Sequence, residues 1–109
     1  MKPVWWIGDS RKAVQGFSVD ARREAGYQLD RVQRGEAPTD WKPMGSVGVG
    51  VREIRIRAEN ACRVLYVAQF AEAVYVLHAF VKKSQRTPKA DIDLAAQRYR
   101  DLMAERKKP

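Results

Sequence analysis

The sequence predicts one α+β domain over residues 1–109, with a single antiparallel sheet of about four strands. Three observations predict this class. A segment with helical apolar spacing fills the first third, three strand-like runs follow it, and a strongly capped helical pattern closes the chain. Two N-terminal helices and one C-terminal helix are therefore expected to flank the sheet, in the order β-α-α-β-β-β-α.

The first expected elements are a short strand and a short helix. The apolar run VWWI at 4–7 lies between a proline and a glycine and is typical of a buried strand. We expect both of its tryptophans, Trp5 and Trp6, to pack in the core. Asp9 and Ser10 are then expected to cap a short helix that ends near Phe17.

A second helix is expected to begin at Ser18, a residue type that favours the N-cap. Its apolar residues are spaced by four, four and three positions and form one face, made of Ala21, Ala25, Leu29 and Val32. Gly35 suits a left-handed helix end, and Pro38 prevents continuation. The Gly- and Pro-rich segment 35–48 is expected to be a loop, which carries Trp41 as a candidate for stacking on a base.

Three strands are expected next. The run VREIRIR at 51–57 alternates. One face of this expected strand carries Arg52, Ile54 and Ile56. The opposite face carries Val51, Glu53, Arg55 and Arg57. The runs at 62–70 and 73–81 are almost continuously apolar and are joined by a two-residue link, which is typical of a hairpin of central strands.

The last expected element is a helix capped by Thr87, with Pro88 in its first position. Asp91 and Asp93 lie in its first turns, where the helix dipole favours negative charge. Its apolar stripe consists of Ile92, Ala95, Ala96, Tyr99, Leu102 and Met103. Lysines and arginines crowd its end.

Charge restricts the class of partner. The chain has 21 Lys and Arg against 13 Asp and Glu, a formal net charge of +8, and a pI near 10.0. Such an excess favours a polyanion such as nucleic acid, although a well-solvated surface explains it equally well. The single cysteine, Cys62, is expected to be a buried apolar residue in a reducing compartment. With no export signal and no run near the ~18 apolar residues of a membrane span, we expect a soluble, cytoplasmic protein.

Most enzyme motifs are absent. The glycines at 45, 48 and 50 lack the Lys-Ser/Thr of a phosphate-binding P-loop, and a single histidine excludes a multi-histidine metal site. We therefore expect no metal and no cofactor. Any chemistry falls to Arg, Lys, Tyr or the single histidine, His78, which lies mid-strand in phase with Val76, Phe80 and Lys82. A histidine there is either a satisfied core residue or a proton carrier on an open face.

Basic residues concentrate in the second half of the chain. The stretch 51–86 holds three acidic residues and seven basic ones, namely Arg52, Arg55, Arg57, Arg63, Lys82, Lys83 and Arg86. Arg63 lies inside an apolar strand, so its guanidinium needs a partner. Two partners are considered, a salt bridge to Glu53 and a phosphate. Lys82 and Lys83 are expected to point in opposite directions, and a solvated surface is the alternative to an RNA contact.

Three segments together resemble the RelE/HigB-type toxins, most closely their phage-derived HigB-like branch. They are VREIRIR at 51–57, CRVLYV at 62–67 and LHAFVKKSQRTPKADIDLAAQR at 77–98. The last is the most specific, because a strand, a Lys-Lys pair and a Thr-Pro helix start follow in order. The resemblance implies a RelE-like fold over essentially the whole chain.

The resemblance also implies a function, the cleavage of messenger RNA in the ribosomal A site without a metal ion. A ribose 2′-hydroxyl attacks the adjacent phosphate, while cations neutralise the developing charge. The implied catalytic set is Arg63 on the phosphate, Lys83 or Lys82 at the last strand's end, and Arg55 on an earlier strand, with Glu53 orienting a cation. His78 joins this set because no other residue offers itself for acid–base chemistry, not because the resemblance implies it. From the concentration of charge, Arg52, Arg57 and Arg86 are expected to bind RNA.

A toxin of this kind is held inactive by a cognate antitoxin, often a helix-turn-helix DNA-binding protein. Two other functions stay open. A ParE-like toxin poisons DNA gyrase by contact and needs no catalytic residues. A basic module that binds nucleic acid without cutting it would need only the charge.

Overall fold

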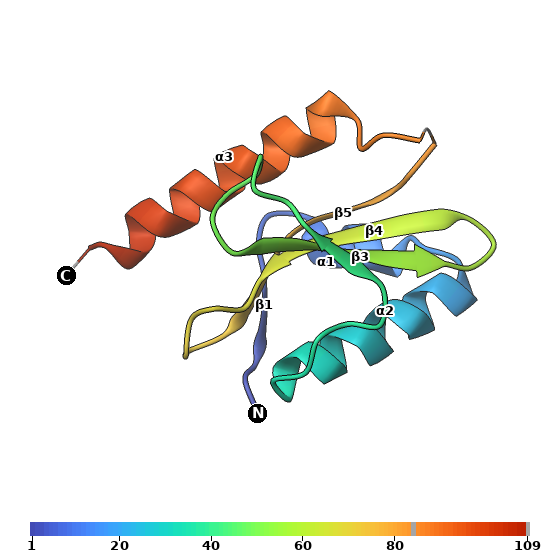
Figure 1. Ribbon diagram of the computed structural model, residues 1–109, viewed down its shortest axis with the longest axis horizontal. Coiled ribbons are helices and arrows are strands. Elements are labelled where there is room, and N and C mark those ends of the chain that lie inside the picture. Colours follow the sequence, from blue (N-terminus) through green and yellow to red (C-terminus); the bar gives the residue numbers. More distant parts are fainter. Residues whose placement is uncertain (84, 109) are drawn as a thin grey trace.

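A five-stranded sheet separates two helices from a third (Figure 1). This computed structural model describes residues 1–83 and 85–108. Helices α1 and α2 cover one face of the sheet, and α3 covers part of the other. The elements are β1 (Val4–Trp6), α1 (Ser10–Gln15), α2 (Val19–Gln33), β2 (Trp41–Pro43), β3 (Val51–Arg57), β4 (Ala61–Val67), β5 (Val74–Val81) and α3 (Lys89–Arg106).

The α+β class is confirmed and the expected elements follow one another as predicted, but an additional strand lies among them and the sheet is mixed. Its order is β1-β5-β4-β3-β2, and β1 pairs with β5 in parallel. The other neighbours are antiparallel. The additional strand, β2, lies inside the segment expected to be a loop. With three residues it is too short to show alternation, and its Pro43 is tolerated because β2 is an edge strand.

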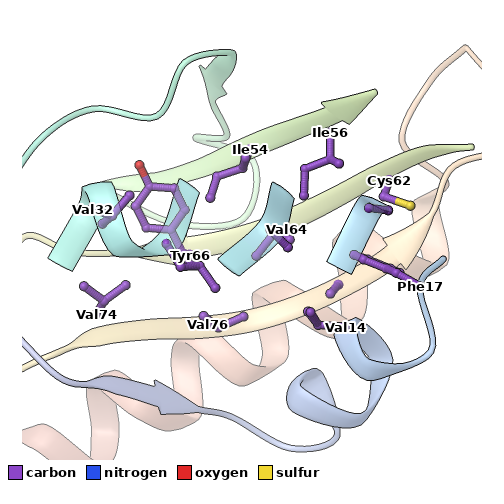
Figure 2. Close-up of a cluster of buried hydrophobic side chains, with 14 residues drawn as sticks. Val14, Phe17, Val32, Ile54, Ile56, Cys62, Val64, Tyr66, Val74 and Val76 are labelled. Atoms are coloured by element: carbon purple, nitrogen blue, oxygen red, sulfur yellow. The ribbon is translucent and has the colours of Figure 1, made fainter. Parts of the chain in front are cut away.

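The face under α1 and α2 carries the larger apolar core (Figure 2). The expected stripe of α2 is buried there against Ile54, Ile56, Val64 and Tyr66 of the sheet. The expected ends of α2 are also confirmed. Ser18 accepts a hydrogen bond from the Ala21 amide at 3.2 Å, and Gly35 follows the helix with φ +85°.

Two expectations about the N-terminal segment were wrong. Asp9 is the N-cap of α1 by position, but its side chain makes no capping bond and instead binds the Arg98 guanidinium at 2.7 Å. The Ser10 hydroxyl donates to the Val76 carbonyl at 3.1 Å. Trp5 is 57% exposed, because β1 is an edge strand and Trp5 points away from the α1–α2 core that Trp6 contacts.

Helix α3 packs its expected stripe on the other face, where Ala95 and Leu102 are buried. It begins one residue later than expected, at Lys89, with Pro88 as its N-cap. The Thr87 hydroxyl makes no cap because it donates to the Glu53 carboxylate at 2.9 Å.

A β-bulge in β5 changes the phase of this strand. Leu65 pairs with His78 and Tyr66 pairs with Val76, so Leu77 is the extra residue. Val76 therefore packs in the α1–α2 core, while His78 stacks on Phe80 on the α3 face, with ring centroids 5.3 Å apart. The expectation that His78 shares a face with Val76 was wrong, because a bulge reverses the alternation.

Candidate functional site

The candidate site is centred on Glu53, whose side chain is fully buried on the α3 face of β3. Within residues 1–83 and 85–108, three groups contact its carboxylate. Arg63 Nε lies 3.4 Å from Oε1, Lys42 Nζ lies 3.8 Å from the same oxygen, and the Thr87 hydroxyl donates to Oε2 at 2.9 Å. A buried carboxylate needs such partners, since transfer from water penalises the charged form.

Arg63 comes from the neighbouring strand β4 and is 7% exposed. One of its terminal nitrogens donates to the Cys62 carbonyl at 2.9 Å. The salt bridge to Glu53 that the sequence suggested is present, but it is a contact of charges without a well-aligned hydrogen bond. Within 1–83 and 85–108, neither Arg63 Nε nor Glu53 Oε1 has a hydrogen-bond partner. The guanidinium therefore retains donor capacity for a further acceptor.

Lys82 follows β5 and continues the α3 face in phase with Phe80, whereas Lys83 is exposed. The pKa of Lys82 lies below its ordinary value of 10.5. Desolvation is the main cause, and Arg63 adds to it; Lys42 and Arg55 act in the same direction, while Glu53 opposes them. These influences show that Lys82 shares one electrostatic environment with the residues around Glu53.

We call this group the Glu53 cluster, and its members are Lys42, Glu53, Arg55, Arg63, Lys82 and Thr87. Two of its cations, Arg63 and Lys42, contact the buried carboxylate. Arg55 pairs with Arg63 in the β3–β4 register, and Lys82 is influenced by all of these charges. Arg55 is also within 3.7 Å of Asp40, which precedes β2. Lys42, Arg55 and Lys82 are each only half-buried, so the cluster is open to solvent. Such a group can bind a phosphate and stabilise charge that develops on it.

The structure thus brings together Glu53, Arg55, Arg63 and Lys82 of the candidates from the sequence. It adds two residues that sequence reasoning missed. Lys42 pairs directly across from Glu53 in the β2–β3 register, and Thr87 reaches the carboxylate from the segment before α3. The missed signal was a strand at 41–43, which would have placed Lys42 opposite the acid.

The remaining candidates lie elsewhere. Arg52 is on the opposite face of β3, with its guanidinium 4.1 Å from the centroid of the Trp41 ring. Arg57 binds Asp40 at 3.4 Å at the exposed end of β3, and Arg86 is exposed between β5 and α3. His78 is buried on the α3 face, with Nε2 2.6 Å from Asp91 of α3.

Within residues 1–83 and 85–108, no group of three or more His, Cys, Asp or Glu side chains is arranged to hold a metal ion. No helix in those residues has both the length and the apolar character needed to cross a membrane.

Comparison with protein families gives one match. Residues 12–100 match the family described as "Phage derived protein Gp49-like (DUF891)". No curated protein matches the chain. The family match includes most of α1, all of α2, all of β2 to β5 and most of α3, and hence every residue of the Glu53 cluster. The chain therefore belongs to the phage-derived Gp49-like family.

Proposed function

We propose that this chain is the toxin of a type II toxin–antitoxin pair and that it acts as a ribosome-dependent, metal-independent messenger RNA endoribonuclease. The observation that carries the proposal is the Glu53 cluster, in which two cations contact one buried carboxylate and two more lie beside them on an open part of the sheet. Membership in a phage-derived family supports it, because the sequence resembles the phage-derived branch of the RelE/HigB-type toxins.

The roles follow from position and charge. Arg63 and Arg55 bind the scissile phosphate and neutralise the charge that develops as the 2′-hydroxyl attacks phosphorus. Glu53 fixes Arg63 and Lys42 in place. Lys82 is the candidate general base, because its lowered pKa increases the deprotonated fraction near neutral pH. Lys82 takes the proton of the 2′-hydroxyl as the oxygen attacks phosphorus. The bond to the 5′-oxygen breaks as the new bond forms, and that oxygen takes up a proton from water.

The exposed cations around the cluster, Arg57, Lys83 and Arg86, would contact phosphates of the flanking RNA. The partners of the proposed toxin are the translating ribosome with its message and a cognate antitoxin, and the place of action is the cytoplasm. We assign His78 a structural role, since Asp91 holds its ring and Phe80 separates it from Lys82 along β5.

The test is cleavage of a message in a reconstituted translation reaction, followed by primer extension. The wild-type protein should cut the message when ribosomes translate it and leave free message intact. Lys82→Met should lower the cleavage rate by about 10²- to 10⁴-fold, the range for loss of a general acid–base group. Lys12→Ala removes an exposed cation from α1, on the other face of the sheet, and should cut like the wild type.

Other outcomes would support the two alternatives. Growth arrest that persists in Lys82→Met, with messages intact and DNA supercoiling inhibited, would favour a gyrase poison. A wild-type protein that binds RNA but neither cuts it nor arrests growth would be a binding module. Each result contradicts the nuclease proposal.

A further inference from the structure

A cavity of about 350 Å³ lies on the face of the sheet opposite the Glu53 cluster. It lies between the C-terminal end of α2, the N-terminal segment and the strands β3 and β4. Its lining includes Lys2, Val32, Glu36, Arg52, Tyr66 and Gln69. Arg52 and Glu53 are neighbours in β3 and point to opposite faces, so the cavity is separate from the proposed catalytic site.

The hydroxyl of Tyr66 has no hydrogen-bond partner within residues 1–83 and 85–108, although the residue is 1% exposed. Figure 2 shows its ring beside Val32, with the oxygen at the end that points away from Val76. An unpaired buried hydroxyl destabilises the folded protein, because it gives up its bond to water without gaining another. A phenylalanine would fill the same space without this cost. Burial raises the pKa of Tyr66, and the nearby Arg52 guanidinium acts against this effect, so the hydroxyl and the guanidinium form one polar end of the cavity.

Two cations at the cavity lack an acidic partner. Lys2 donates to the neutral carbonyl of Ala68 at 2.6 Å, and Arg52 stacks on the Trp41 ring. Neither forms a salt bridge within the described residues. The one acid in the lining, Glu36, pairs with Arg31 at 3.2 Å. The charge that remains uncompensated at the cavity is therefore positive.

We propose that this cavity binds a small organic anion, which presents a carboxylate or phosphate to Lys2, Arg52 and the Tyr66 hydroxyl. The volume is near the lower end for small-molecule sites and suits a ligand of metabolite size. Val32, Ala37 and Ala68 supply an apolar wall for the rest of the ligand. Tyr66 donates its proton to the anion, while the two cations balance its charge.

Phenyl phosphate is a suitable probe, with phenol as its neutral counterpart, and binding can be followed by calorimetry and by amide shifts in NMR spectra. Phenyl phosphate should bind with a dissociation constant near 1 mM or below, and phenol about tenfold more weakly or not at all. The shifted amides should be those of Ala37, Ala68 and Gln69 rather than those around Arg63.

Three variants separate binding from folding. Tyr66→Phe should weaken binding of phenyl phosphate by about tenfold, the loss expected for one hydrogen bond to a charged group. Its melting temperature should equal or exceed that of the wild type, because the unpaired hydroxyl is gone. Arg52→Gln should weaken binding by at least about tenfold. Lys12→Ala, which removes a cation of α1 outside the cavity, should bind as the wild type does.

Three binding results would each overturn the proposal. They are no binding at about 10 mM phenyl phosphate, equal binding of phenol, and unchanged affinity in both Tyr66→Phe and Arg52→Gln. Shifts confined to the amides around Arg63 and Lys82 would likewise overturn it, since they would place the anion at the Glu53 cluster. None of these results bears on the proposed nuclease activity, which is measured separately.

Discussion

Glu53 and Arg63 lie on adjacent antiparallel strands with their charged groups 3.4 Å apart, and both side chains are almost completely removed from solvent. Their contact fixes a guanidinium at the centre of the Glu53 cluster. A buried pair of this kind adds little net stability against an apolar replacement, but breaking it leaves a charge alone in the interior. The pair is therefore better explained by what it positions than by its contribution to folding.

Glu53→Gln should lower the free energy of unfolding by about 3 kcal/mol, because Arg63 then stays buried without a counter-charge. Urea denaturation followed by circular dichroism measures this change. The double variant Glu53→Gln/Arg63→Met should recover part of the loss. Glu59→Gln is the matched control, since Glu59 is exposed in the β3–β4 turn and should change stability by less than about 0.5 kcal/mol. Equal effects of the two single variants would contradict the prediction.

Lys82 should titrate below its ordinary pKa of 10.5, and its neighbours should tune that value. Arg55→Gln removes one lowering charge and should raise the pKa of Lys82, while Glu53→Gln should lower it further. The Cε resonance of Lys82 in ¹³C NMR reports the titration directly. Because the folded protein binds this proton less tightly than the unfolded chain, the contribution of Lys82 to stability should increase as pH rises from the folded pKa to 10.5. If neither substitution changed the pKa of Lys82, Lys82 would not belong to the Glu53 cluster.

The bond between His78 and Asp91 joins β5 to the first turn of α3 at 2.6 Å. Asp91→Ala should therefore lower stability by about 1–2 kcal/mol, since it leaves a buried imidazole nitrogen unpaired. It should leave the rate of RNA cleavage by the folded protein unchanged. Asp93→Ala, which removes an exposed i,i+4 partner of Lys89, should cost less than about 0.5 kcal/mol. If folded Asp91→Ala no longer cleaved RNA, the structural role of His78 would be contradicted and His78 would be a catalytic candidate again.

The parts of the site that the sequence predicts correctly are those that depend only on the alternation of side chains along one strand. Glu53 and Arg55 were assigned to one face of β3 by the two-residue period, and the structure confirms this assignment. Arg63 is predictable as a site residue because a guanidinium in an apolar strand needs a partner. Glu53 is one of the two partners that the sequence allows, the other being a phosphate. These inferences require only the geometry of a single strand.

The remainder of the site depends on pairing between distant segments. Lys42 joins the cluster only through the register of β2 with β3, and three residues carry no detectable alternation. The bulge at Leu77 is set by the match of β5 to β4, so the orientation of His78 could not be read from one strand. The parallel pairing of β1 with β5 likewise joins segments that are distant in the sequence, so no local pattern predicts it.

The loop between β2 and β3 approaches α3 so closely that a side chain at Gly48 would collide with it. A Cβ there would lie 2.5 Å from the Tyr99 ring, whose hydroxyl donates to the Val49 carbonyl at 2.9 Å. Gly48→Ala should therefore destabilise the protein by about 1–3 kcal/mol. Gly45→Ala in the same loop meets no atom within 4 Å and should be neutral or stabilising by up to about 1 kcal/mol. Similar melting temperatures for the two variants would contradict this account.

The far end of α3 is held by a pH-dependent contact. Arg106 donates to Glu72 at 2.7 and 3.2 Å, and the Tyr75 hydroxyl donates to the same carboxylate at 2.8 Å. These bonds, with Arg106 the largest influence, lower the pKa of Glu72 from 4.5 to about 2. A carboxyl whose pKa is lowered by folding stabilises the protein fully above pH 4.5 and loses this effect as pH falls to about 2.

The stability difference between the wild type and Glu72→Gln should therefore be constant above pH 5 and shrink between about pH 4.5 and 2. Urea midpoints measured across this range test it. Arg106→Gln should show the same pH profile, because it removes the other half of the same contact. If the difference for Glu72→Gln stayed constant down to pH 2, the contact would not form in solution. The end of α3 would then be held by its apolar contacts alone, chiefly Leu102 and Met103 against the sheet.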